Sequence, residues 1–294
     1  KTGINLGAID TSTAATSSTA SAGTLSLNSS TGNILLNGDI NTSAVAGSGS
    51  NLNFNNSASL AKSLTINTVG NAGSGSVIFN NSLDGTTAES QNLTLNAGTG
   101  NIAFSGAVGG STSLGNLTAN STGATLFNAV SATNLTTNAG GTTQLNGNVN
   151  TAGKQTYGDA VVIANNPILT GTEIAFGNTV NGSSNLTVNS GTGNITFSGA
   201  IGNSTPLTNL TANSTGITVF NAVNAGSLTT DAGGKTQLNA NVNTTGNQTY
   251  GDAVTIANNP VLASKGINFD STLDGNSNLI VNSGTGNITF SGAI

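Results

Sequence analysis

Two copies of a Tyr-Gly-Asp triplet are the places where an aromatic hydroxyl and a carboxylate lie close together in this sequence. They occupy residues 157–159 and 250–252. A phenol beside a carboxylate can contact a sugar or hold a weakly bound cation. The same three residues also form tight turns, because glycine adopts backbone dihedral angles that other residues avoid. We favour the turn, so neither triplet is assigned a ligand.

Two further acidic residues are followed by glycine, at Asp84-Gly85 and Asp274-Gly275. Both pairs are typical of turns. Neither pair matches the acidic, glycine-rich nonapeptides that bind calcium in some repeat proteins. The sequence therefore predicts no metal site and no cofactor.

The composition leaves few routes to catalysis. The chain has no His and no Cys, ten acidic residues and five basic ones, all of them lysine. Catalysis needs a nucleophile with a base, a carboxylate pair or a metal cluster. β-Helical polysaccharide lyases and hydrolases cluster acids with Arg, Lys or His, whereas the acids here are thinly spread. We expect no catalytic residues and no enzyme activity, with a carbohydrate-active β-helix enzyme as a weaker alternative.

Asparagine is abundant, and many Asn-Xaa-Ser/Thr sequons result. They include Asn92, Asn116, Asn120, Asn194 and Asn213. In a chain this rich in Asn and Thr such matches arise by chance, so we expect a structural role. Asn tolerates left-handed backbone conformations and stacks amide on amide between neighbouring strands.

The strongest candidates for such amide stacking are Asn96, Asn189 and Asn282, which recur at one spacing. Threonine recurs as well, once in each Asn-Leu-Thr segment, which suggests an ice-binding surface as an alternative. The recurring residues are Thr94, Thr118, Thr136, Thr187 and Thr211. Their uneven intervals make this alternative less favoured.

The chain repeats itself every 93 residues. The sequence of Asn92–Ile102 is repeated, with few changes, at Asn185–Ile195 and again from Asn278. We therefore divide the chain into diverged coils at 1–91, one copy at 92–184, a second at 185–277, and the start of a third at 278–294. Self-similarity at a fixed period predicts a continuous repeat architecture.

Each copy contains apolar residues that alternate with polar ones, as in β-strands with one buried face. Leu93 and Leu95 should point inward and Thr94 outward, and Val162 should face water. At 124–127 both faces carry apolar residues, so the inward face is not assigned. Glycine, asparagine, threonine and valine disfavour helices almost everywhere.

The strands are expected to stack as a right-handed parallel β-helix, or β-solenoid. Dividing each copy into five coils, two of them at 154–167 and 168–184, gives coils of about 19 residues and about 16 coils in all. At about 4.8 Å per strand, the resulting rod would be about 75 Å long. Phe104, Phe197 and Phe290 should then line up inside, five coils apart.

The charge balance excludes several partners. A net charge of −5 without arginine is unlike a nucleic-acid-binding protein. No apolar run is long enough to span a membrane, and Lys1 is not followed by the apolar core of a signal peptide. We expect no nucleic-acid partner and no membrane insertion of this segment.

The Asn-Leu-Thr-Xaa-Asn strands, the Gly-Thr-Gly-Asn-Ile turns and the Phe-Ser-Gly-Ala-Val/Ile tails resemble the passenger repeats of filamentous-haemagglutinin-like large exoproteins. Those proteins belong to two-partner secretion and autotransporter systems of diderm bacteria. The resemblance implies a right-handed parallel β-helix, export through an outer-membrane β-barrel, and a role as an adhesin shaft or surface fibre.

The sequence hypothesis is therefore a structural shaft or filament segment of a large secreted bacterial surface protein, located outside the cell or at its surface. A self-polymerising matrix or sheath fibre is the alternative of the same fold. Expected partners are further coils or further copies of the chain, and a glycan or cell-surface ligand. The core strand in 287–294 runs to the last residue without a polar cap, so we expect more coils or another subunit to flank this segment.

Overall fold

The computed structural model describes residues 3–12, 24–30 and 32–294. It is all-β, with parallel strands stacked as a β-solenoid of about 13 turns. Lys1, on which the expectation about a signal peptide depends, lies outside the described residues, as does part of the 1–91 segment. Among the described residues, no helix is long and apolar enough to cross a bilayer.

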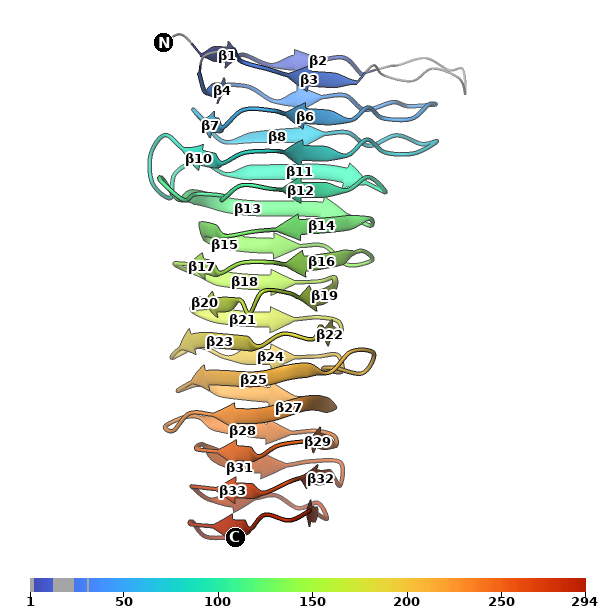
Figure 1. The fold of residues 1–294 in the computed structure, drawn as a ribbon. Helices are drawn as coiled ribbons and strands as arrows, with labels where there is room; N and C mark the ends of the chain where they lie inside the picture. The colour runs from blue at the N-terminus through green and yellow to red at the C-terminus, as the bar shows by residue number, and fades with distance from the viewer. Residues whose placement is uncertain (1–2, 13–23, 31) are drawn as a thin grey trace. The chain divides into compact units, whose positions relative to one another are not determined.

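The chain forms two compact units, Lys1–Ala152 and Gly153–Ile294. In each unit the strands form three rows, and the described strands within a row pair in parallel (Figure 1). Each coil of the chain contributes one short segment to each row. A residue therefore has its neighbours in a row one coil before it and one coil after it.

In the first unit, one row contains β3 (Leu25–Leu27), β6 (Leu52–Phe54), β9 (Val77–Phe79), β12 (Ile102–Phe104), β14 (Ala124–Phe127) and β16 (Thr142–Leu145). A second row contains β2 (Ile9–Asp10), β5 (Ile40–Asn41), β8 (Leu64–Asn67), β11 (Leu93–Gly98), β13 (Leu114–Ser121) and β15 (Val130–Thr137). The third row contains β1 (Ile4–Leu6), β4 (Ile34–Leu36), β7 (Ala58–Leu60) and β10 (Leu83–Gly85), continues through Val108 to the start of β15, and ends at β17 (Val149–Thr151).

In the second unit we name the rows A, B and C. Row A contains β19 (Ala160–Ile163), β22 (Val180–Asn181), Ile201, the start of β27 (Val223–Thr230), β29 (Val242–Thr244), β32 (Val261–Ser264) and β35 (Ile280–Ser283). Row B contains β18 (Lys154–Tyr157), β21 (Glu173–Phe176), β24 (Ile195–Phe197), β26 (Ile217–Phe220), β28 (Lys235–Leu238), β31 (Ala253–Ile256) and β34 (Leu273–Asp274). Row C contains β20 (Ile168–Thr170), β23 (Leu186–Gly191), β25 (Leu207–Ser214), the end of β27, β30 (Gln248–Tyr250), β33 (Ile267–Phe269) and β36 (Ile288–Phe290).

The alternation along each strand sets which side chains fill the interior. Leu93 and Leu95 are buried and Thr94 is not, as the sequence predicts. Val162 is exposed, which is also confirmed. At β14 the inward residues are Thr125 and Phe127. The aromatic ring therefore decides the face that the sequence left unassigned.

Phenylalanine rings stack on one another inside the solenoid. In the first unit Phe54, Phe79, Phe104 and Phe127 form one stack, with ring centroids 4.3, 5.1 and 5.4 Å apart. In the second unit two stacks begin with a tyrosine. They are Tyr157, Phe176, Phe197 and Phe220 in row B, and Tyr250, Phe269 and Phe290 in row C.

Residues 93 apart do not share a row in the second unit. Phe197 lies in row B and Phe290 in row C, so the prediction that they line up is wrong. β23 lies at the start of one 93-residue copy, and β35 lies at the start of the next. From β23 the chain makes four complete coils, which return it to row C at β33, and it then passes through row B at β34 before it reaches β35 in row A. A copy is therefore one face short of five coils, and the following copy starts on another row.

Coil length is also more variable, and on average longer, than predicted. Thr187 pairs with Thr211, 24 residues later, whereas Thr211 pairs with Thr229 after 18 residues. Gln155 pairs with Ile174, 19 residues later, so 154–167 is only part of a coil. This explains why the structure has about 13 turns and not about 16. No observation tests the handedness, which stays a prediction.

Candidate functional site

The tyrosines of the Tyr-Gly-Asp triplets are fully buried. The Tyr250 hydroxyl donates a hydrogen bond to Oε1 of Gln248, at 3.0 Å. Nε2 of Gln248 in turn donates to the backbone oxygens of Val242 and Ala263, both at 3.0 Å. The phenol thus belongs to a network inside the coil, where no sugar can reach it.

The first triplet repeats this arrangement. The Tyr157 hydroxyl donates to Oε1 of Gln155 at 2.9 Å, and Nε2 of Gln155 donates to the backbone oxygen of Thr170 at 2.8 Å. Burial raises the pKa of both Tyr157 and Tyr250 well above the ordinary value of 10.0. Both phenols therefore stay protonated at any physiological pH.

The carboxylates of the triplets are buried too. Asp252 Oδ1 accepts a hydrogen bond from the backbone N–H of Gly234 at 2.8 Å, and Oδ2 accepts one from the Thr236 hydroxyl at 2.9 Å. Burial raises the pKa of Asp252, and the nearby Asp231 charge raises it further, against the lowering effect of the two hydrogen bonds. This carboxylate fixes the turn of the preceding coil.

The glycine of the second triplet is required for space and not for its dihedral angle, which corrects the sequence argument. The φ of Gly251 is not in the left-handed region. A Cβ at this position would lie 2.7 Å from the backbone carbon and oxygen of Asp231. The backbone of the preceding coil therefore leaves room only for glycine.

The two Asp-Gly pairs differ from one another. Asp84 and Gly85 belong to β10, so the predicted turn is wrong there. Asp84 Oδ1 instead accepts hydrogen bonds from the backbone N–H groups of Ser111 and Thr112, at 2.8 and 3.2 Å. At the other pair, Gly275 directly follows β34 and has a φ of 143°, consistent with the predicted turn.

Within the described ranges, no three His, Cys, Asp or Glu residues lie close enough together to hold a metal ion. One ion pair occurs on the surface of the second unit, between Lys154 Nζ and Glu173 Oε2 at 2.7 Å. Its two side chains are largely exposed, so its contribution to stability is small.

Asparagine amides stack as predicted at two of the three proposed positions. Nδ2 of Asn120 donates to Oδ1 of Asn96, and Nδ2 of Asn213 donates to Oδ1 of Asn189, both at 2.8 Å. Asn282 lies beside Ala263 on the preceding coil, as Asn189 lies beside Thr170. No residue of the chain is in register with Asn282 on a following coil, so its amide stacking stays a prediction.

Asparagines of the sequons also bind the adjacent coil. Oδ1 of Asn92 accepts a hydrogen bond from the backbone N–H of Asn116 at 2.6 Å. Oδ1 of Asn194 accepts one from the backbone N–H of Ile217 at 2.9 Å. These contacts are consistent with a structural role for the sequons.

Threonines form two unbroken columns on the outside. In the first unit Thr65, Thr94, Thr118 and Thr136 are in register on successive coils. In the second unit Thr187, Thr211, Thr229 and Thr249 are in register in the same way. The argument from uneven intervals is therefore wrong, because the extra residues are taken up between strands.

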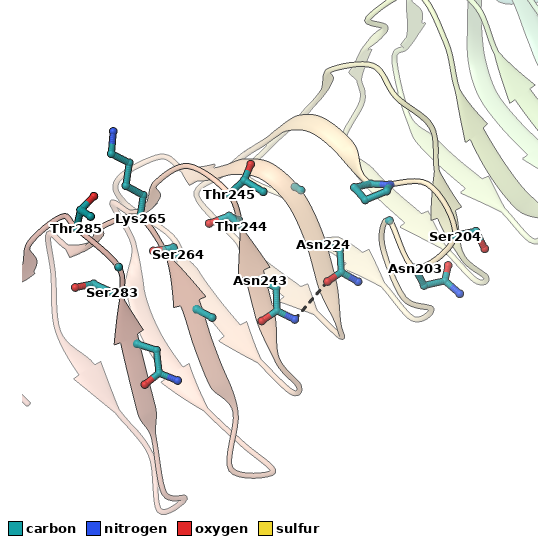
Figure 2. A pocket seen from close by; sticks show the side chains of 16 residues that line it. Asn203, Ser204, Asn224, Asn243, Thr244, Thr245, Ser264, Lys265, Ser283 and Thr285 are labelled. Carbon is teal, nitrogen blue, oxygen red and sulfur yellow. Dashed lines mark hydrogen bonds between the residues drawn. The ribbon is translucent and has the colours of Figure 1, made fainter.

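The second unit also contains an open groove of about 990 Å³ along row A. Asn224 of β27, Asn243 of β29 and Asn282 of β35 line it. Nδ2 of Asn243 donates to Oδ1 of Asn224 at 3.3 Å (Figure 2). One end is formed by the segment 202–206, which includes Asn203.

The opposite rim of this groove carries hydroxyls and one positive charge. Thr245, Lys265 and Thr285 lie there, at the turns that follow β29, β32 and β35 (Figure 2). The Lys265 side chain extends away from the strands. The groove thus combines amides, hydroxyls and an ammonium group across several coils.

This groove was not predicted from the sequence. Its residues come from five separate stretches of chain, and only the register between coils brings them together. A signal was nevertheless present in the comparison of the copies. Asn203, Pro206 and Lys265 stand where the preceding copy has Gly110, Ser113 and Thr172.

Comparison of the chain with protein-family models, curated proteins and solved structures found no match.

Proposed function

We propose that this chain is a structural shaft or filament segment of a large secreted bacterial surface protein. The observation that carries the proposal is the coil-to-coil stacking within each unit. Inward rows of apolar residues, aromatic stacks and outward amide ladders all join one coil to the next. A fold of this type is extended by adding coils, because each repeat uses its neighbours as its core.

We also propose that the chain is not an enzyme. The tyrosines and the aspartates of the Tyr-Gly-Asp triplets are buried. Tyr250 and Asp252 have hydrogen-bond partners within the fold. An active site needs titratable groups that converge where a substrate can reach them.

The location is tested on intact cells of the source bacterium. Protease added outside the cells should remove the chain, detected with an antibody raised against residues 153–294, while a cytoplasmic marker stays intact. Protection of the chain until the cells are lysed would contradict a surface location. The self-polymerising matrix or sheath fibre remains the alternative, and fractionation separates the two: a matrix protein is found in cell-free material.

One observation favours a second candidate function. The two in-register threonine columns form regular arrays of hydroxyl and methyl groups on the outside of parallel strands. Such arrays can order water and bind ice. Thermal hysteresis of the purified chain tests this function, and its absence would exclude it.

A further inference from the structure

We infer that the groove along row A binds a linear oligosaccharide that carries a carboxylate. The inference deepens the proposed function, on which it rests for its biological meaning, by placing a ligand-binding surface on the shaft itself. It concerns Asn224, Asn243, Asn282 and Lys265, with Thr245 at the rim.

The chemistry of the lining matches vicinal hydroxyl groups. An asparagine amide offers a donor and an acceptor side by side, as sugar hydroxyl pairs require. Asn282 and Lys265 make no side-chain hydrogen bond or ion pair to another described residue. Ala263 and Pro206 add apolar surface that suits the C–H faces of a sugar ring.

The spacing of the lining favours a glycan over an extended peptide. Asn224, Asn243, Ala263 and Asn282 are in register on successive strands, which lie about 4.7–4.9 Å apart. One pyranose unit with its glycosidic oxygen has a similar length. An extended peptide advances about 3.2–3.4 Å per residue and would not keep step with these positions.

Lys265 supplies the charge preference. It is the charged residue among those lining the groove, on a chain whose net charge is −5. An ammonium group attracts a carboxylate on the ligand, while the rest of the surface does not favour a polyanion. The preceding copy has threonine at the corresponding position, Thr172.

The test uses the purified 294-residue chain and amide chemical shifts measured by NMR. The probe is a hyaluronan hexasaccharide, which carries a carboxylate on alternate sugars, and a chitin hexasaccharide is the neutral comparison. We expect shifts at the groove residues, and weaker binding of the neutral sugar. No shifts at the groove at millimolar hyaluronan, or shifts spread over the whole surface, would overturn the inference.

Three variants sharpen the result. Asn243→Ala and Lys265→Gln should each weaken hyaluronan binding about three- to tenfold, as expected for the loss of one hydrogen bond or ion pair. Lys235→Gln is the matched control, because Lys235 is an exposed lysine of row B outside the groove. Equal effects of Lys265→Gln and Lys235→Gln would contradict a defined site.

These outcomes are independent of the test of location. Binding in solution by a chain that is absent from the cell surface would refute the proposed function and leave the groove assignment intact. A surface-exposed chain that does not bind either sugar would do the reverse. Unchanged thermal unfolding of each variant shows that the fold is preserved.

Discussion

The residues that look most reactive in this sequence hold the fold together. Tyr250 and Asp252 are buried, and each has hydrogen-bond partners inside the coil or on the preceding one. Buried polar groups are costly unless they are paired. Their partners, Gln248 and Thr236, are therefore as important as the triplet itself, and neither stands out in the sequence.

The aromatic stacks give a direct test of packing at a single residue. Phe197 is fully buried between Phe176 and Phe220, with ring centroids 4.7 and 5.4 Å away. Phe197→Ala should lower the free energy of unfolding by about 3–5 kcal/mol, measured by urea denaturation. Phe290 is 39% exposed and stacks on Phe269 alone, so Phe290→Ala should cost clearly less. Equal losses would show that stacking inside the coils is not the cause.

Asp252 predicts a pH dependence of stability. Its pKa in the folded chain is raised above 3.8, so the folded state binds this proton more tightly than the unfolded state. The contribution of Asp252 to stability is therefore fully present below pH 3.8 and is lost as the pH rises through the folded pKa. Asp252→Asn keeps an oxygen that can accept from Gly234 and removes the titration.

The measurement is urea unfolding of the natural chain and of Asp252→Asn at several pH values. The stability of the natural chain relative to the variant should fall as the pH rises from about 4 towards neutrality. Asp231 is the charged neighbour that also acts on Asp252, so Asp231→Asn should reduce the fall. A difference between natural chain and variant that does not change with pH would contradict this account.

At the scale of elements, the strands are short and the turns carry much of the specificity. The chain has two Asn-Asn-Pro turns. The turn at residues 165–167 connects β19 of row A to β20 of row C, and the turn at residues 258–260 connects β31 of row B to β32 of row A. Both asparagines of each turn have a positive φ, between 53° and 59°. Asparagine tolerates this conformation better than other residues with a side chain, whereas alanine does not.

Asn258 allows this to be measured. Asn258→Ala should destabilise the chain by about 1–2 kcal/mol, because the left-handed conformation becomes strained. Asn258→Gly should be better tolerated, since glycine adopts a positive φ freely. Thermal unfolding of the two variants tests the difference. If glycine is as damaging as alanine, the hydrogen bond from Asn258 Nδ2 to the backbone oxygen of Asn239, which both variants lack, outweighs the backbone strain.

The alternation of apolar and polar residues was sufficient to predict the strands, their inward faces and the amide contacts of Asn96 and Asn189. The same reasoning failed for the alignment of Phe197 with Phe290. The cause is that the local sequence does not show how many strand segments a copy contains. A copy is one segment short of five complete coils, so the next copy begins in another row. The groove was not predicted for a related reason, because its lining depends on which strands become neighbours in row A.

At the scale of the whole molecule, the proposed shaft should change length in steps of one copy. Deleting 185–277 joins residue 184 to residue 278, whose sequence matches that of 185 onwards. The shortened chain should stay folded and lose about 22 Å of length, because a copy spans four and two-thirds coils at about 4.8 Å each. Small-angle X-ray scattering of both chains measures the change. Loss of β-structure in the shortened chain would contradict independent stacking of the copies.

The row change between copies has a consequence for how such an array meets its surroundings. Side chains repeated once per copy are displaced by one face each time, so they return to their starting side only at every third copy. Three successive copies then present the same group on three different faces of the solenoid. A fibre built from many such copies would display the group on all of its faces. A binding partner could then reach the group from any side, and the fibre would not have to rotate about its axis.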